Sequence, residues 1–345
     1  MLHRTWPVPG PDMRLACNLS GIGDSYMHLQ LLSSATQRRR SGRAGVLRGL
    51  LWIAALQMLT PAASCAAGQS LDLGYAAVLR AADGLSGLDH GWRTHGVAVD
   101  RAFDRHVMPH VDALDGLSTQ ELGVLLRATH VAAVASKQPR YSDIALRIGM
   151  QLRAQGAVQP ADIRAGALIA MISRDGASLT PSSPWAPAFN GAPMPTLPET
   201  RRDFEYWTLA ADAASYRTAI ADMAALRIVV IAHPACGFTR AVADAARADP
   251  ELGRMLSGTG ALWLSPQDGT LDPRIFTDWG ARHPDLPIRI VARQSGFPEF
   301  GYWGTPTFYI LRDGKVAARV VGWPAGGNKA ALHKAFADAG IATGP

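Results

Sequence analysis

Residues 304–315 read Gly304-Thr305-Pro306-Thr307-Phe308-Tyr309-Ile310-Leu311-Arg312-Asp313-Gly314-Lys315, and they carry the most specific structural signals in the chain. The run at 307–311 is rich in β-branched and aromatic residues and predicts a strand. Asp313 and Gly314 predict a tight hairpin turn into a second strand at 317–321. A proline directly before a strand is awkward with a trans peptide bond, so we expect a cis bond between Thr305 and Pro306.

A second stretch, residues 231–240, reads Ile231-Ala232-His233-Pro234-Ala235-Cys236-Gly237-Phe238-Thr239-Arg240. It follows an apolar run at 227–232 of the buried-strand type and places Cys236 at the start of a predicted helix. Unpaired backbone N–H groups and the helix dipole stabilise a thiolate there, so a cysteine at this position has a lowered pKa and raised reactivity. His233 adds a positive charge nearby when it is protonated. The alternative is that Cys236 is a small buried apolar residue, as most free cysteines are.

Around these two stretches, residues 203–345 show the pattern of an α/β fold. We expect strands at 227–232, 261–264, 288–292, 307–311 and 317–321, and helices at 203–226, 240–256, 273–282 and 329–339. Strands that first alternate with helices and then form a hairpin predict a central mixed sheet flanked by helices.

The cysteine at a helix start, the Gly-Thr-Pro-Thr-Phe turn and the Asp-Gly-Lys hairpin resemble the thioredoxin superfamily, most closely its exported branch of TlpA-like and disulfide-exchange proteins. The resemblance covers about residues 203–345 and implies a thioredoxin-like fold. It implies that the cis-proline turn packs beside Cys236. The backbone of Thr305 and Pro306 would then pair with an extended substrate peptide, as in β-augmentation, with Gly304 and His233 beside it.

The chain departs from the family at the resolving position. Active members carry Cys-x-x-Cys, whereas this chain has Thr239 where the second cysteine belongs. A dithiol cycle needs that second sulfur to release the mixed disulfide. Cys17 and Cys65 lie in or beside an N-terminal segment that we expect to be removed. We therefore expect a monothiol catalytic site, in which Cys236 is the nucleophile and Thr239 hydrogen-bonds the thiolate.

Three functions stay open at this point. The first is monothiol disulfide exchange with a protein or peptide of the cell envelope, where an external thiol resolves the adduct. The second is a non-catalytic binding or assembly module that uses the cis-proline face for a peptide. The third is a peroxiredoxin-like or glutathione-dependent enzyme, although the Pro-x-x-x-Thr-x-x-Cys pattern usual in peroxiredoxins is missing. We expect no cofactor for any of them.

The sequence before residue 203 has a different character. Residues 68–178 predict an α-helical domain, with helices at 141–154 and 160–172 and a capping box at the start of another. Residues 179–202 contain six prolines, which forbid a regular helix or central strand and predict a linker or surface strap. Trp185 and Phe189 indicate that this strap packs against another part of the protein.

His106 and His110 lie four residues apart, a spacing that can place two metal ligands on one face of a helix. Pro109 would disturb such a helix and no further ligand is identifiable, so we expect no metal site.

Residues 1–67 form an N-terminal extension and carry most of the basicity. They hold seven arginines and two acidic residues, so they contribute +5 of the chain's formal net charge of +6. The remaining +1 gives no electrostatic argument for binding nucleic acid. Five of the arginines precede an apolar run at 49–59 and small residues at 61–67, which is typical of a secretory signal and too short to span a membrane. A buried helix is the alternative interpretation.

The signal predicts a periplasmic protein whose mature chain begins near residues 65–68. The sequence Ala62-Ala63-Ser64-Cys65 also resembles a bacterial lipobox. Cys65 is therefore a candidate for lipidation, and a lipid anchor or the signal itself would be the protein's contact with the membrane.

Overall fold

The structure is a computed structural model that describes residues 61–84, 91–190, 194–199, 202–210 and 215–342. The chain divides into two compact units, residues 1–67 and residues 68–345, and the architecture below is that of the second unit. The signal-like stretch at 38–59 lies outside the described residues. The same holds for the side chain of Cys65, whose backbone belongs to helix α2 (Pro61–Gly84). Among the described residues, no helix is both long enough and apolar enough to cross a bilayer.

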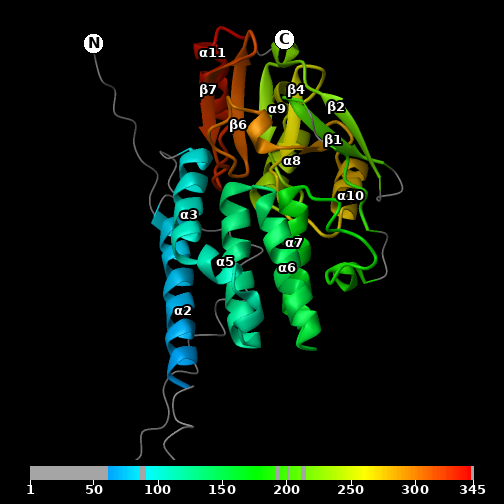
Figure 1. Cartoon of the computed structure of the whole chain (residues 1–345). Coiled ribbons are helices and arrows are strands. Elements are labelled where there is room, and N and C mark those ends of the chain that lie inside the picture. Colours follow the sequence, from blue (N-terminus) through cyan, green and yellow to red (C-terminus); the bar gives the residue numbers. More distant parts are fainter. Residues whose placement is uncertain (1–60, 85–90, 191–193, 200–201, 211–214, 343–345) are drawn as a thin grey trace, which may run out of the picture. The chain divides into compact units, whose positions relative to one another are not determined.

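The first half of the second unit consists of helices that pack on one another (Figure 1). They are the later part of α2, then α3 (Trp92–His106), α4 (Met108–Val111), α5 (Thr119–Ser136), α6 (Arg140–Ala154) and α7 (Pro160–Ser173), with a 3-10 turn η2 at Leu114–Gly116. Helix α5 packs against α3, α6 and α7, and α6 packs against α7. Their apolar faces form one core, in which the rings of Phe103 and Tyr141 meet edge to face at 5.1 Å. The helices expected at 141–154 and 160–172 are confirmed.

The capping box at the start of α5 is also confirmed. Ser118 Oγ accepts the backbone N–H of Glu121 at 3.3 Å, and the Ser118 N–H donates to Glu121 Oε2 at 2.8 Å. Both bonds satisfy backbone donors that the first helical turn leaves unpaired. The hydrogen bonds from Ser118 also lower the pKa of Glu121.

The proline-rich strap after α7 is anchored by Trp185, as the sequence indicated. The Trp185 indole is fully buried and lies between α6 and α7 against Gly149 and Gly166. A Cβ at these two glycines would lie 2.2 Å and 2.3 Å from indole carbons. Phe189, in the 3-10 turn η3 (Ala186–Phe189), is buried as well. The two glycines are therefore required by the close approach of an aromatic ring.

The second half contains a sheet of seven strands within the described residues, in the order β2-β1-β5-β4-β3-β6-β7. The strands are β1 (Glu205–Leu209), β2 (Tyr216–Ile220), β3 (Ile228–Ile231), β4 (Ala261–Ser265), β5 (Ile288–Val291), β6 (Thr307–Arg312) and β7 (Lys315–Val321). β3, β4 and β5 run parallel, and the other neighbouring pairs are antiparallel. The expected combination of a mixed sheet with helices in an α/β architecture is confirmed.

Four helices cover one face of this sheet: α8 (Gly237–Ala248), α9 (Pro250–Leu256), α10 (Arg274–Arg282) and α11 (Lys329–Asp338). Alternate residues of β3 serve two cores. Ile228 and Val230 pack under these helices, and Val229 and Ile231 pack on the other face with aromatic residues of the loop before β6. Burial on both faces explains why β3 is a continuous apolar run. The single helix expected at 240–256 is in fact α8 and α9, because Pro250 cannot continue the helix that precedes it.

The hairpin that joins β6 and β7 turns at Asp313 and Gly314, as predicted. Both residues have positive φ, 53° and 74°. An Asp-Gly pair suits that conformation, which matches the twist of the flanking strands.

The expectation of a helix at 203–226 is wrong. These residues form the antiparallel pair β1–β2 and the 3-10 turn η4 (Met223–Ala225). β1 also pairs with β5, and the side chain of Trp207 in β1 is buried against the ring of Tyr216. The alanines at 210–214 favour a helix locally. Pairing with β5, which lies about 80 residues further along the chain, outweighs that preference, since strand formation depends on such non-local packing.

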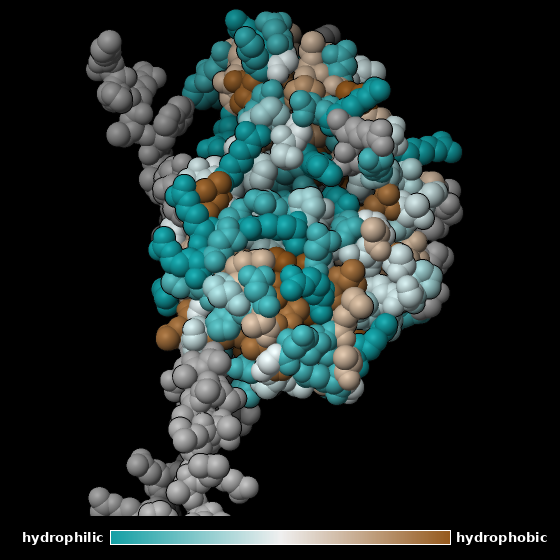
Figure 2. All heavy atoms as spheres, viewed as in Figure 1, coloured by the Kyte–Doolittle hydropathy of each residue, from teal (hydrophilic) through white to brown (hydrophobic). Residues whose placement is uncertain are grey.

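Figure 2 shows that the viewed face of the molecule is largely hydrophilic, with hydrophobic residues gathered over its helical part. Large apolar side chains are exposed at Leu73, Val97 and Met150 on helices and at Ile220 on β2. They lie on four different elements, and single exposed apolar side chains of this kind are ordinary on a protein surface.

Candidate functional site

Cys236 lies at the start of α8, as the sequence predicted. β3 ends at Ile231, a short loop follows, and Cys236 is the residue that caps α8, with φ −77° and ψ 123°. Its N–H donates to the carbonyl of His233 at 2.9 Å, and its own carbonyl accepts the Arg240 N–H at 3.1 Å. These two bonds join a turn at 233–236 to the first turn of the helix.

The turn before β6 lies against this cysteine. The peptide bond between Thr305 and Pro306 is cis, and the Cys236 thiol donates to the Thr305 carbonyl at 3.5 Å. The pairing of β3 with β6, which sets Ile231 opposite Thr307, brings the two stretches together. The predicted meeting of Cys236 with the cis-proline turn is confirmed.

Gly304 has a steric role in this turn. A Cβ at Gly304 would lie 2.3 Å from the phenolic oxygen of Tyr302 and 2.5 Å from the ring. The Gly304 carbonyl accepts the Thr307 hydroxyl at 2.6 Å, which ties the two ends of the turn together. Gly304 thus allows Tyr302 to pack closely over the backbone of the turn.

The thiol is largely enclosed. Cys236 is 6% exposed, whereas its neighbours Ala235 and Gly237 are exposed. The Cys236 side chain makes no capping bond to the backbone N–H groups of α8, because it points to the Thr305 carbonyl.

Thr239 lies one helical turn beyond Cys236 and is fully buried. Its Oγ1 accepts the backbone N–H of His233 at 3.4 Å, so it braces the same turn. A hydrogen bond from Thr239 to a thiolate stays a prediction.

His233 is held by its two ring nitrogens. Nδ1 accepts the Ala235 N–H at 3.1 Å, and Nε2 lies 3.1 Å from Asp268 Oδ2 and 3.2 Å from Thr270 Oγ1. Burial acts to lower the pKa of His233, but the Asp268 carboxylate, with a contribution from Cys236, raises the pKa above its usual value of 6.5.

Asp268 was not singled out from the sequence. It lies in the loop after β4, and its Oδ1 accepts both the N–H and the hydroxyl of Thr270. Burial opposes ionisation, but the charges of His233 and Arg174 and the hydrogen bonds outweigh it and hold the pKa of Asp268 well below its usual range. Parallel β3 and β4 end at the same edge of the sheet, so a polar residue just after β4 was the signal that could have identified it.

Gln267 of this loop and Arg174, just after α7, tie the loop to the helical half. Gln267 donates to the Ile172 carbonyl in α7 at 2.6 Å. Arg174 donates to the carbonyls of Val291, Ala292 and, at 3.4 Å, Asp268. Burial lowers the pKa of Lys137, at the end of α5, to about 8; Asp268 opposes this shift and Arg174 adds to it. The helical half therefore shapes the surroundings of Asp268.

No family model, curated protein or solved structure matches this chain. The chemistry of the site is therefore inferred from its own geometry.

The paired histidines of the first half do not form a metal centre in the described residues. α3 ends at His106, and His110 belongs to α4, which has Pro109 in its first turn. In the described part of the chain, no group of three or more His, Cys, Asp or Glu side chains is placed to hold a metal ion.

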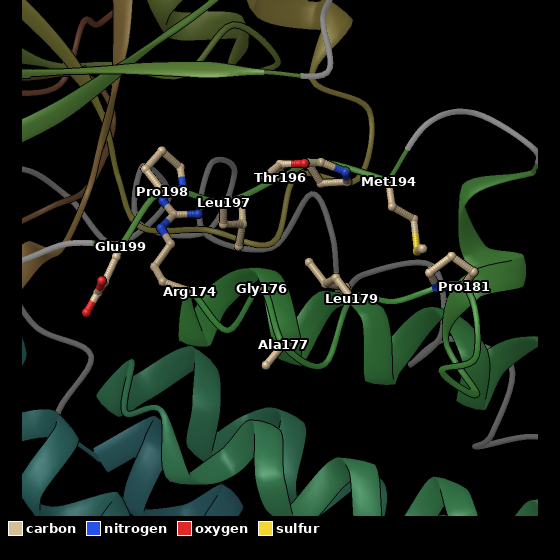
Figure 3. Close-up of a pocket in the computed structure, with 11 residues that line it drawn as sticks. Arg174, Gly176, Ala177, Leu179, Pro181, Met194, Thr196, Leu197, Pro198 and Glu199 are labelled. Atoms are coloured by element: carbon tan, nitrogen blue, oxygen red, sulfur yellow. The ribbon is translucent and has the colours of Figure 1, made fainter.

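A groove of about 570 Å³ lies between the end of α7 and the proline-rich strap (Figure 3). Its walls are mixed: Leu179, Met194 and Leu197 are apolar, and the charged residues Arg174 and Glu199 also line it. The Arg174 guanidinium already donates to backbone carbonyls, and none of the site residues predicted from the sequence lines the groove. We assign it no function.

Proposed function

We propose that this chain is an exported protein with a thioredoxin-like domain, in which Cys236 is a single nucleophilic thiol that forms mixed disulfides with envelope proteins or peptides. The observation that carries the proposal is the position of Cys236, which caps α8 and touches the Thr305 carbonyl of the cis-proline turn. A helix start favours the thiolate over the thiol. The neighbouring turn offers backbone groups to an extended substrate.

The order of the elements supports the domain assignment. Within residues 228–338, a buried strand, a cysteine at a helix start, a second parallel strand, a helix, the cis-proline turn, a hairpin and a last helix occur in this order, with the further strand β5 between the helix α10 and the turn. This is the order that the family resemblance implies. Export is proposed from the sequence at 38–67 alone.

The proposed reaction is an exchange that conserves the number of disulfides. The Cys236 thiolate attacks one sulfur of a substrate disulfide, the S–S bond of the substrate breaks, and the other substrate sulfur leaves as a thiolate. The product is a mixed disulfide between Cys236 and the substrate. Thr239 carries no sulfur that could attack it, so an external thiol must release the adduct and regenerate Cys236.

The test uses the full chain with Cys17→Ser and Cys65→Ser, so that Cys236 is its only thiol. We expect incubation with an oxidised peptide to give an adduct of one peptide half per chain, detected by intact-protein mass spectrometry. The adduct should persist after excess peptide is removed, and glutathione should release it at a rate proportional to the glutathione concentration. Cys236→Ser should form no adduct. A folded chain that forms none with Cys236 present contradicts the proposal.

The second candidate is a non-catalytic binding module that uses the cis-proline face. One observation favours it, since Cys236 is only 6% exposed and its thiol is already bonded to the Thr305 carbonyl. In such a module Cys236 is a packing residue and substrate disulfides leave it unchanged.

A further inference from the structure

The partners of His233 determine where its proton lies. The Ala235 N–H can only donate, so Nδ1, which accepts it at 3.1 Å, carries no proton. The proton of neutral His233 is therefore on Nε2, 3.1 Å from the Asp268 carboxylate that accepts it. The carboxylate selects this tautomer, because the opposite one would set a bare nitrogen against an anion.

The Asp268 carboxylate is itself fixed in place. Thr270 donates to it twice, at 3.2 Å from the N–H and at 2.9 Å from the hydroxyl. The preceding residue, Gln267, exchanges two backbone–side-chain bonds of 3.0 Å with Gln294 and donates to the Ile172 carbonyl of α7. The loop after β4 is thus clamped to the helical half on one side and to the loop after β5 on the other.

We propose that Asp268 and His233 are positioning residues for Cys236: the carboxylate holds the imidazole so that Nδ1 accepts the Ala235 N–H, and this bond sets the turn that presents the thiol at the start of α8. The proposal rests on the role of Cys236 as a nucleophile. The Ala235 bond spans two residues and lies inside the turn closed by the Cys236 N–H and the His233 carbonyl. Losing it leaves the Ala235 N–H, just before the cysteine, without this acceptor.

The arrangement makes the site sensitive to pH. Protonation gives Nδ1 a hydrogen, so the Ala235 N–H loses its acceptor and meets a second donor.

The charged and titratable groups around His233 are Asp268 after β4, Cys236 in its own turn, and Arg240 of α8, which donates to the carbonyls of Pro234 and Ala235. Arg174, Lys137 and Tyr216 face Asp268 from the ends of α7 and α5 and from β2. Because Asp268 raises the pKa of His233, the turn is intact above that pKa and is lost as the pH falls through it.

The experiment compares variants of the full chain that also carries Cys17→Ser and Cys65→Ser. His233→Asn keeps an acceptor for the Ala235 N–H, since an Asn oxygen bonds the N–H two residues on in an Asx turn, but it does not titrate. His233→Ala removes the acceptor, and Asp268→Asn removes the carboxylate. Asp272→Asn is the matched control, because Asp272 is a nearby carboxylate on the surface that pairs with Arg274. The readouts are the pH profile of iodoacetamide alkylation at Cys236 and the 15N NMR titration of the His233 ring.

In the parent chain we expect NMR to show the Nε2–H tautomer, and the alkylation profile to contain a step at the pKa that NMR gives for His233. Asp268→Asn should move the alkylation step and the NMR pKa of His233 to lower pH. Asp272→Asn should leave the step and the pKa unchanged. His233→Asn should remove the step and keep the alkylation rate at pH 8 within about twofold of the parent rate. His233→Ala should lower the alkylation rate at pH 8 about tenfold, which is the equivalent of one hydrogen bond.

Three results would overturn the proposal: the opposite tautomer, a step that Asp268→Asn leaves in place, or a rate for His233→Ala equal to or above that of His233→Asn. A faster alanine variant would mean that the turn shields the thiol. None of these readouts needs a disulfide substrate. If the step behaves as expected but Cys236 forms no mixed disulfide, the proposed function fails while the positioning pair stands.

Discussion

Thr239→Cys is expected to give the chain insulin-reducing activity that it otherwise lacks. Thr239 lies one turn after Cys236 on α8, at the position where the proposed family resemblance would put a resolving sulfur. A sulfur there attacks the mixed disulfide from within the molecule, at an effective concentration on the order of millimolar or above. The side chain changes little in volume. It gives up only the hydrogen bond with the His233 N–H, a loss of about 1 kcal/mol.

The measurement is the rate of insulin precipitation with dithiothreitol as electron donor, in the background with Cys17→Ser and Cys65→Ser. Adding Cys236→Ser should abolish the activity. Thr129→Cys, at a buried threonine of α5, is the matched control and should gain none. A folded Thr239→Cys variant that forms no internal disulfide and reduces nothing would show that the site does not have redox geometry.

Gly166→Ala is expected to destabilise the protein by about 1–3 kcal/mol, although alanine is the better helix former by about 1 kcal/mol. Its Cβ would lie 2.3 Å from the buried indole of Trp185, so α7 must shift or the indole must leave its site. Gly149→Ala meets the same ring from α6 and should act alike. Urea unfolding followed by circular dichroism measures the difference.

Two controls isolate the cause. In α5, a Cβ at Gly123 would meet only the end of the flexible Arg127 side chain at 3.5 Å, so Gly123→Ala should be neutral or stabilising by up to about 1 kcal/mol. In a Trp185→Ala background the ring is absent, and Gly166→Ala should then cost nothing. A loss of stability that persists without Trp185 would mean that the indole is not the cause.

Local signals in the sequence predicted the parts of the fold that depend on neighbouring residues. Ser118 and Glu121 predict the start of α5, and Asp313 and Gly314 predict the hairpin. Cys236 lies at the predicted start of α8. Caps and turns of this kind depend on backbone groups only a few residues apart. The β1–β2 pair was misread as a helix. Trp207 is buried where β1 pairs with β5, and no local pattern encodes that pairing.

Part of the candidate site could be predicted from the sequence and part could not. Cys236, Thr305 and Pro306 could be brought together because the strands that carry them have recognisable boundaries. Asp268 was missed, since its closeness to His233 depends on the parallel pairing of β3 and β4, which the position of a polar residue just after β4 only indicates, and on the bonds of Gln267 to the helical half. The helical half, whose role the sequence did not reveal, shapes the loop that carries Asp268.

The reactivity of Cys236 in the folded chain, compared with the same chain unfolded in urea, tests most directly whether this thiol is a working nucleophile. The quantity is the rate of iodoacetamide alkylation at pH 7 with Cys17→Ser and Cys65→Ser, each rate divided by that of a small thiol in the same solvent. If the helix start activates the thiol, the folded chain should react at least about tenfold faster than the unfolded one. If the folded chain reacts more slowly, Cys236 is a buried packing residue and the proposed exchange chemistry is wrong.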